Sequence, residues 1–201
     1  WITSRGLGDV YKRQVFEITR QRGCVARKSI AASGPQIYFL SDDGVFTLQQ
    51  GLDPAKNLGV AISKVSGEAI PLSRPIQDQF KDVNFAHADK AVGIVFDNKY
   101  FLAVPTGSST DNNKILVYDI LKTAWTSVDS FPGGFVIDDF VTVLHGNNPQ
   151  KRRLFVVNDK GWHLVDEGTA DITGTIGNPG TTITAISAKL KTRSFTLGSV
   201  D

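Results

Sequence analysis

Short runs of apolar residues separated by compact polar turns dominate the chain from residue 36 onward. The run at 37–40 (IYFL) leads into Ser41-Asp42-Asp43-Gly44 and then into 45–48 (VFTL). An Asp-Gly pair between two such runs is typical of a tight hairpin, because glycine supplies the positive φ that the turn needs. The pattern predicts β-strands joined by hairpins.

The same layout recurs twice, and the three hairpins lie roughly 55–60 residues apart. The later copies have apolar runs at 93–96 and 100–104 around Asp97-Asn98-Lys99, and at 154–157 and 162–165 around Asn158-Asp159-Lys160-Gly161. A repeat of this length indicates a fold built from similar sheets placed one after another.

Further strands are predicted between and after these hairpins. NKILVYDI (113–120) and TAWTSVD (123–129) form a pair joined by Leu121-Lys122, and a large flat side chain such as Trp125 is expected to cover the gap between adjacent sheets. Another strand is predicted at 140–144, and a last pair at 182–188 and 194–197.

We therefore predict an all-β fold, a partial β-propeller of about three blades of antiparallel strands. A sandwich would place its turns every 8–12 residues without the longer period. Propellers typically close with four or more blades, so residues 15–201 are expected to be a propeller fragment truncated at both ends.

One segment departs from the strand pattern. In PIQDQFKDVN (75–84), Ile76, Phe80 and Val83 share one helical face, and Pro75 suits the first turn. We expect one short helix of about two turns that connects blades, with its charged residues facing away from the apolar stripe.

Residues 1–14 do not fit the rest of the chain. WITSRGLGDVYKRQ lacks the apolar core of a secretory signal, and its basic residues are scattered. It resembles the translation of a sequencing-library adapter, with Asp9–Gln14 matching a transposon end. We expect a non-native, adapter-derived segment and native sequence from about Val15.

Composition excludes some classes of function. The net charge is +2, from 22 basic and 20 acidic residues, so the chain as a whole has no strong positive potential that would attract nucleic acid. No apolar stretch is as long as a membrane-spanning helix requires. The single cysteine, Cys24, permits no internal disulfide and is expected to behave as a small apolar residue rather than as a nucleophile.

Candidate metal and phosphate sites are weak. His87, His145 and His163 have no metal-binding spacing, and the glycine-containing loops at 107–113 and 173–180 lack the lysine and helix of a phosphate loop. The oxygens of Asp111, Asn112 and Asn113 suit Ca²⁺, but the spaced acidic pattern is missing. We predict no metal and no cofactor.

Catalytic carboxylates are also not indicated. Glycosidases need two carboxyl groups at a set separation, and the candidates here are Asp42, Asp43, Asp97, Asp138, Asp139, Asp166 and Glu167. The first three occupy turns, where aspartate is favoured for local reasons. The basic run Lys151-Arg152-Arg153 is expected to keep a strand edge soluble rather than to bind phosphate. We predict no enzymatic activity and no catalytic residues.

Five short sequence segments, in the order in which they occur here, resemble the β-propeller virion proteins of short-tailed bacteriophages, of the tail tubular protein B and packaged-DNA-stabilisation types. The phrases are GCVARKSIAASGPQIYFLSDDGVFTL, PLSRPI, NKYFLAVP, NKILVYDILKTAW and KTRSFTLG, over about residues 22–198. The resemblance implies a structural protein of the phage tail, assembled as a homo-oligomeric ring around the DNA channel.

That resemblance also implies the partners: other virion proteins at the portal and tail adaptor, and a weak contact with packaged DNA. The expected location is the virion, after synthesis in the host cytoplasm, with no membrane association. The alternative is a kelch-like or carbohydrate-binding or carbohydrate-active propeller that acts through loops on one face.

Overall fold

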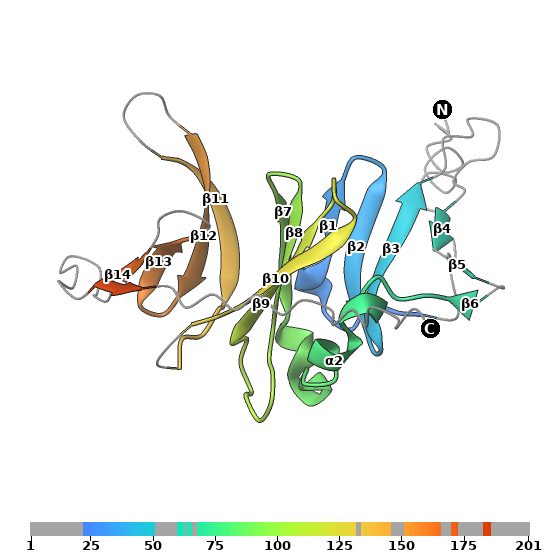
Figure 1. Cartoon of the computed structure of the whole chain (residues 1–201), viewed down its shortest axis with the longest axis horizontal. Coiled ribbons are helices and arrows are strands. Elements are labelled where there is room, and N and C mark those ends of the chain that lie inside the picture. Colours follow the sequence, from blue (N-terminus) through green and yellow to red (C-terminus); the bar gives the residue numbers. More distant parts are fainter. Residues whose placement is uncertain are drawn as a thin grey trace, which may run out of the picture.

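The computed structural model describes residues 22–50, 60–62, 64–65, 68–131, 134–145, 151–165, 170–172 and 183–185. Residues 1–14, which resemble an adapter, lie outside these ranges. Within them the chain is mostly β, and three antiparallel sheets follow one another along the sequence (Figure 1).

Each of the three sheets is a meander, in which consecutive strands of the chain are hydrogen-bonded neighbours. The first sheet contains β1 (Ala31–Ser33), β2 (Gln36–Ser41), β3 (Gly44–Gln50) and β4 (Val60–Ile62). The second contains β7 (Val92–Phe96), β8 (Lys99–Val104), β9 (Lys114–Asp119) and β10 (Ala124–Ser130). The third contains β11 (Asp139–His145), β12 (Lys151–Asn158) and β13 (Gly161–Leu164).

All three predicted hairpins are confirmed, as β2–β3, β7–β8 and β12–β13. They do not occupy equivalent places, because β7–β8 joins the first two strands of its sheet, whereas the other two join the second and third strands. The spacing of the hairpins is therefore not the repeat of the sheets. A tight turn can connect any two adjacent antiparallel strands of a sheet. Its sequence therefore does not indicate which two strands of the sheet it connects.

Gly44 lies at the end of the β2–β3 turn, with a φ of 158°. Asp42 and Asp43 form the turn, and Gly44 is the first residue of β3, opposite Ser41. A Cβ on Gly44 would lie 2.5 Å from Ser73 Oγ and 2.6 Å from Pro71 Cβ. The glycine is required because another segment of the chain packs directly against its backbone. In β7–β8 the turn residues do have positive φ, 47° at Asp97 and 56° at Asn98.

The second sheet is covered on both faces, which explains its continuous apolar runs. Alternate residues of a strand point to opposite faces. Tyr100, Leu102 and Leu116 belong to an apolar cluster shared with the first sheet. Phe101 and Ile115 belong to a separate cluster shared with the third sheet. All five residues are buried, so the middle sheet holds its neighbours together.

Trp125 of β10 lies where the sequence places it, at the boundary between the first two sheets. Its ring packs edge-on against Tyr118, with 5.2 Å between centroids, and joins the cluster of the first two sheets. Its indole Nε1 donates a hydrogen bond of 2.9 Å to the carbonyl of Leu72, in the connection between those sheets. The prediction that this tryptophan covers the gap between sheets is confirmed.

The connection between the first and second sheets contains the predicted helix, in a shorter form. α2 (Gln77–Phe80) follows a 3₁₀ turn, η2 (Arg74–Ile76), and a second 3₁₀ segment, η3 (Phe85–Lys90), leads into β7. Phe80 and Val83 are buried in the core, whereas Asp78, Lys81 and Asp82 are exposed, as expected. Two small hairpins complete the described elements: β5 (Lys64–Val65) with β6 (Glu68–Ala69), and β14 (Ala170–Ile172) with β15 (Ile183–Ala185).

One strand of the last predicted pair is present. The strand predicted at 182–188 appears as β15, which pairs with β14. Its expected partner at 194–197 lies outside the described residues. Among those described, no helix is long and apolar enough to cross a membrane.

The first strands of the three sheets lie next to one another. β1 is in contact with β7, and β7 with β11. In addition, Lys28, in the 3₁₀ turn η1 (Arg27–Ser29) before β1, donates a 2.8 Å hydrogen bond to Asp139 Oδ2 at the start of β11. The first and third sheets therefore meet at this end although the second sheet stands between them.

Candidate functional site

A cavity of about 440 Å³ lies where the chain enters the first strands of the three sheets. We call the residues just before these strands the approach segments: η1 before β1, η3 before β7, and 134–138 before β11. The β8–β9 loop closes the fourth side. The lining residues are Arg27, Lys28, Asp89, Lys90, Asp111, Asn112, Val136, Ile137 and Asp138.

Asn112, in the β8–β9 loop, holds the walls of this cavity together. Its Nδ2 donates to the carbonyls of Lys90 (2.8 Å) and Ile137 (2.9 Å), and its own carbonyl accepts from the amide of Ile137 (2.9 Å). The residue is only 3% exposed. Its side-chain Oδ1 is buried with no hydrogen-bond partner. Because both N–H groups already face carbonyls, turning the amide over would replace two bonds with two repulsions.

Ion pairs neutralise part of the charge around the cavity. Lys28 pairs with Asp139, and Lys90 pairs with Asp111, each at 2.8 Å. The hydrogen bond from Lys90, followed by one from Thr110, holds the pKa of Asp111 below its ordinary value. Asp89, Asp138 and Arg27 take part in none of the ion pairs found in the described ranges.

A larger groove of about 620 Å³ lies between the second and third sheets, at the end of β7. It is lined by Ile94, Val95, Phe96, Asp97, Thr142, Lys151, Arg152, Arg153, Leu154 and Val165. The basic run therefore forms the start of β12. Residues 151–153 pair with β11 along one edge of this strand, whereas β13 pairs along the other edge only from Phe155 onward. The basic run therefore lies on a strand, and its role in keeping that strand soluble stays a prediction.

The three histidines lie on different elements. His87 is in η3, His145 ends β11, and His163 is in β13. Burial, and then the charge of Lys160, holds the pKa of His163 below its ordinary value of 6.5. Across the described part of the chain, no group of three or more histidine, cysteine or acidic side chains could hold a metal ion.

In the loop considered for Ca²⁺, the side-chain oxygens of Asp111 and Asn113 are engaged within the protein. Asn113 Oδ1 accepts 2.9 Å hydrogen bonds from both the backbone N and the Oγ1 of Thr106, and Asp111 faces Lys90. The three side chains of Asp111, Asn112 and Asn113 therefore have separate partners. They form part of the packing of the loop.

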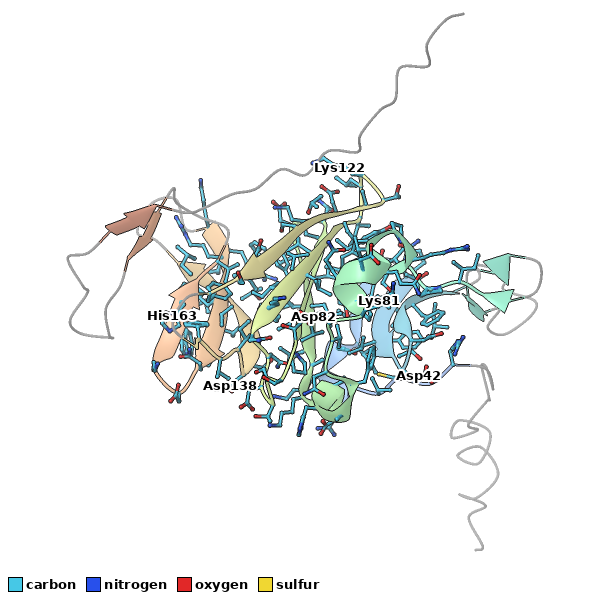
Figure 2. The ribbon with its side chains drawn as sticks, turned by 60° about the horizontal axis from the view of Figure 1, so that its bottom comes forward. Asp42, Lys81, Asp82, Lys122, Asp138 and His163 are labelled. Atoms are coloured by element: carbon cyan, nitrogen blue, oxygen red, sulfur yellow. The ribbon has the colours of Figure 1, made fainter. Side chains whose placement is uncertain are left out.

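The candidate glycosidase carboxylates that the structure describes do not gather in one place. Asp42 and Asp43 occupy the β2–β3 turn beside Arg22, with 2.7 Å between Arg22 Nη2 and Asp43 Oδ2. Asp138 lies near the third sheet, far along the molecule from Asp42 in Figure 2. Asp97 is in the β7–β8 turn, and Asp166 and Glu167 lie outside the described residues, as does loop 173–180.

Cys24 is exposed, which contradicts its expected role as a small apolar residue. Its Sγ–H donates to the carbonyl of Ala26 at 3.0 Å. The buried small residue of this segment is instead Ala26, two positions later.

Sequence reasoning missed the cavity at the approach segments. Asn112 is one of three consecutive polar residues, and its partners Lys90 and Ile137 lie 22 and 25 positions away along the chain. Only the stacking of the sheets brings these positions together. Comparison with protein-family models, with curated proteins and with solved structures finds no match to this chain.

Proposed function

We propose that the three sheets are consecutive blades of a β-propeller that serves as a structural part of a short-tailed phage virion. The observation that supports a propeller most strongly is the arrangement of the first strand of each sheet. β1, β7 and β11 are neighbours, and the later strands of each sheet follow outward from them in chain order. The ion pair of Lys28 with Asp139 supports a common axis, because it joins the ends of the first and third sheets.

The packing supports a rigid scaffold. Adjacent blades share an apolar cluster, so moving one blade would open a buried interface. Buried side chains also continue into the connection between the first two blades, at Phe80 and Val83. A disc of this kind can present its loops to neighbouring subunits without changing shape.

The virion role rests on the resemblance of the blade phrases to phage propeller proteins. In this proposal the protein is not an enzyme. It assembles with other virion proteins at the portal end of the tail, as part of a homo-oligomeric ring around the DNA channel. The approach segments of the blades would open toward the axis of each propeller.

Cryo-electron microscopy of virions that carry the full gene product tests the proposal. We expect density for a closed propeller at the tail, into which the three blades fit as consecutive units. Absence of the protein from purified particles would overturn the virion role. Turnover of glycans by the full-length protein would instead favour the carbohydrate-active alternative.

A further inference from the structure

We infer that the outer edge of β13 pairs with the same edge of a second copy of the chain, so that two third sheets join into one continuous sheet. The inference goes beyond the virion role proposed above and does not depend on it. Three features of β13 carry it: main-chain groups without a partner strand, two exposed apolar side chains, and a register that is complementary to itself.

β13 is the outermost strand of the third sheet in the part of the chain that the structure describes. Its sheet has three strands there, whereas the first and second sheets have four each. The next strand along the chain, β14, pairs with β15 and not with β13. One edge of β13 is therefore bonded to β12, and its other edge has no partner among the described strands.

The main-chain groups of Trp162 and Leu164 point toward this outer edge. At the end of β13, the Val165 amide donates a 2.9 Å hydrogen bond to the carbonyl of Leu154 on β12. Along a strand in an antiparallel sheet, residues that bond to one neighbour alternate with residues that point away from it. His163 therefore bonds toward β12, like Val165, whereas the N–H and C=O of Trp162 and Leu164 point outward.

β13 lacks the features that protect the outer edge of the second sheet. β10 has a register shift between Trp125 and Ser127 and carries Asp129, and both a bulge and a charge hinder pairing with another strand. β13 reads Gly-Trp-His-Leu, without lysine, arginine, acidic residues or proline, and it pairs with β12 without a register shift. Trp162 is 55% exposed and Leu164 is 40% exposed. An edge of this kind is suited to pairing with another strand.

The register of β13 is complementary to itself. When two copies pair antiparallel about His163, Trp162 of one copy lies opposite Leu164 of the other, and the reverse pair forms beside it. Both residues present their N–H and C=O outward, so each pair exchanges both main-chain hydrogen bonds. Their side chains meet on one face as an apolar cross-strand contact. That face also holds Phe155, whose ring centroid lies 6.2 Å from that of Trp162.

This symmetry favours a second copy as the partner, because the same two residues supply donors and acceptors on both sides of the interface. The two His163 rings lie opposite each other on the other face. Burial lowers the pKa of His163, so these rings are uncharged at neutral pH and do not repel each other. The paired segment is short, so the dimer is expected to be weak and to depend on protein concentration.

Hydrogen exchange and sedimentation velocity of the 201-residue chain test the inference, at concentrations from about 10 µM to about 1 mM. We expect dimers to increase over this range, and protection of the Trp162 and Leu164 amides to rise with the fraction of dimer. Rapid exchange of both amides at every concentration would overturn the inference. Protection that does not depend on concentration would also overturn it, because another segment of the same chain would then cover the edge.

Substitutions at Leu164 test the same edge. Leu164→Lys should weaken the dimer by about three- to tenfold, because the symmetric interface loses the apolar contact twice. Leu144→Lys is the matched control, since Leu144 is a leucine on β11 that is 61% exposed and lies away from the β13 edge, and it should leave dimer formation unchanged. Equal dimer affinity in these two variants would contradict the inference.

Leu164→Pro tests the main chain rather than the side chain. Proline removes an N–H that points outward, which β12 does not use, so the chain should fold with a similar unfolding midpoint. The dimer should weaken by at least about fivefold, because a hydrogen bond is lost on each side of the interface. A folded Leu164→Pro chain that forms dimers as readily as the unchanged one would show that the main chain of β13 is not the interface.

Discussion

At the scale of single residues, the Ser29 hydroxyl shows how η1 is fixed to the first sheet. The residue is fully buried, its Oγ donates to the carbonyl of Ala26 at 2.7 Å, and it accepts from the amide of Leu40 at 3.0 Å. The carbonyl of Ser29 also accepts a 2.7 Å hydrogen bond from Tyr100 in the second sheet. Burial raises the pKa of Tyr100, so its hydroxyl stays protonated and remains a donor.

Replacing Ser29 with alanine should therefore lower the free energy of unfolding by about 1–3 kcal/mol, because the Leu40 amide loses its acceptor in a buried place. Urea denaturation of both proteins measures the change. Ser127→Ala, at an exposed position of β10, is the control and should have little effect. Equal stability of the two variants would contradict the assigned role of the Ser29 hydroxyl.

The lowered pKa of His163 predicts a pH dependence of stability. The ring packs edge-on against Phe135, with 4.7 Å between centroids, and its Nε2 lies 3.2 Å from Asn158 Oδ1. In the unfolded chain the His163 ring binds a proton near its ordinary pKa of 6.5, whereas in the folded chain it binds the proton only at lower pH. The stabilising contribution is thus complete above 6.5 and is lost as the pH falls toward the folded pKa.

Unfolding measurements from about pH 8 to about pH 5, compared with those of His163→Gln, isolate this effect. We expect the unchanged chain to lose more stability over this range than the variant. Parallel pH profiles would show that His163 titrates alike in the folded and unfolded states.

At the scale of elements, two tryptophans on the strands of different sheets allow a matched comparison. Trp125 packs on Tyr118 and bonds to the Leu72 carbonyl, whereas Trp162 of β13 is 55% exposed. Trp125→Ala should cost about 2–4 kcal/mol of unfolding free energy, because it removes buried area between two sheets and leaves a carbonyl without its donor. Trp162→Ala should cost less than half as much in the same denaturant titration. A larger loss at Trp162 would refute the role of Trp125 at the sheet boundary.

The elements that the sequence predicted well are those whose signals are local. Apolar runs around Asp-Gly or Asp-Asn turns predict β2–β3 and β7–β8, and the short Leu121-Lys122 turn predicts the pair that contains Trp125. Pairings between separated segments were less predictable, since β15 pairs with β14, a strand that the sequence pattern did not predict. The requirement for glycine at Gly44 likewise comes from Pro71 and Ser73, far along the chain. The cavity around Asn112 depends on three approach segments and could not be derived from any one of them.

At the scale of the whole molecule, the second sheet is the central layer and stabilises both neighbours. Its even-numbered core residues on β8 and β9, such as Leu102, face the first sheet. Its odd-numbered ones, such as Phe101, face the third. The order of the sheets along the chain is therefore also their order of packing, as Figure 1 shows. Such contacts between consecutive units let each sheet fold against the one before it.

This arrangement predicts the effect of removing the third sheet. A chain that ends at Ser130 lacks β11–β13 and uncovers Phe101, Ile115 and Val117 on the second sheet. A contiguous apolar face of this kind promotes association and binds hydrophobic dyes. We expect stronger anilinonaphthalene sulfonate fluorescence and concentration-dependent oligomers by light scattering. A chain that ends at Val165 keeps all three sheets and should behave like the complete one. If both truncated chains were equally monomeric and dye-free, the third sheet would not be what covers this face of the second sheet.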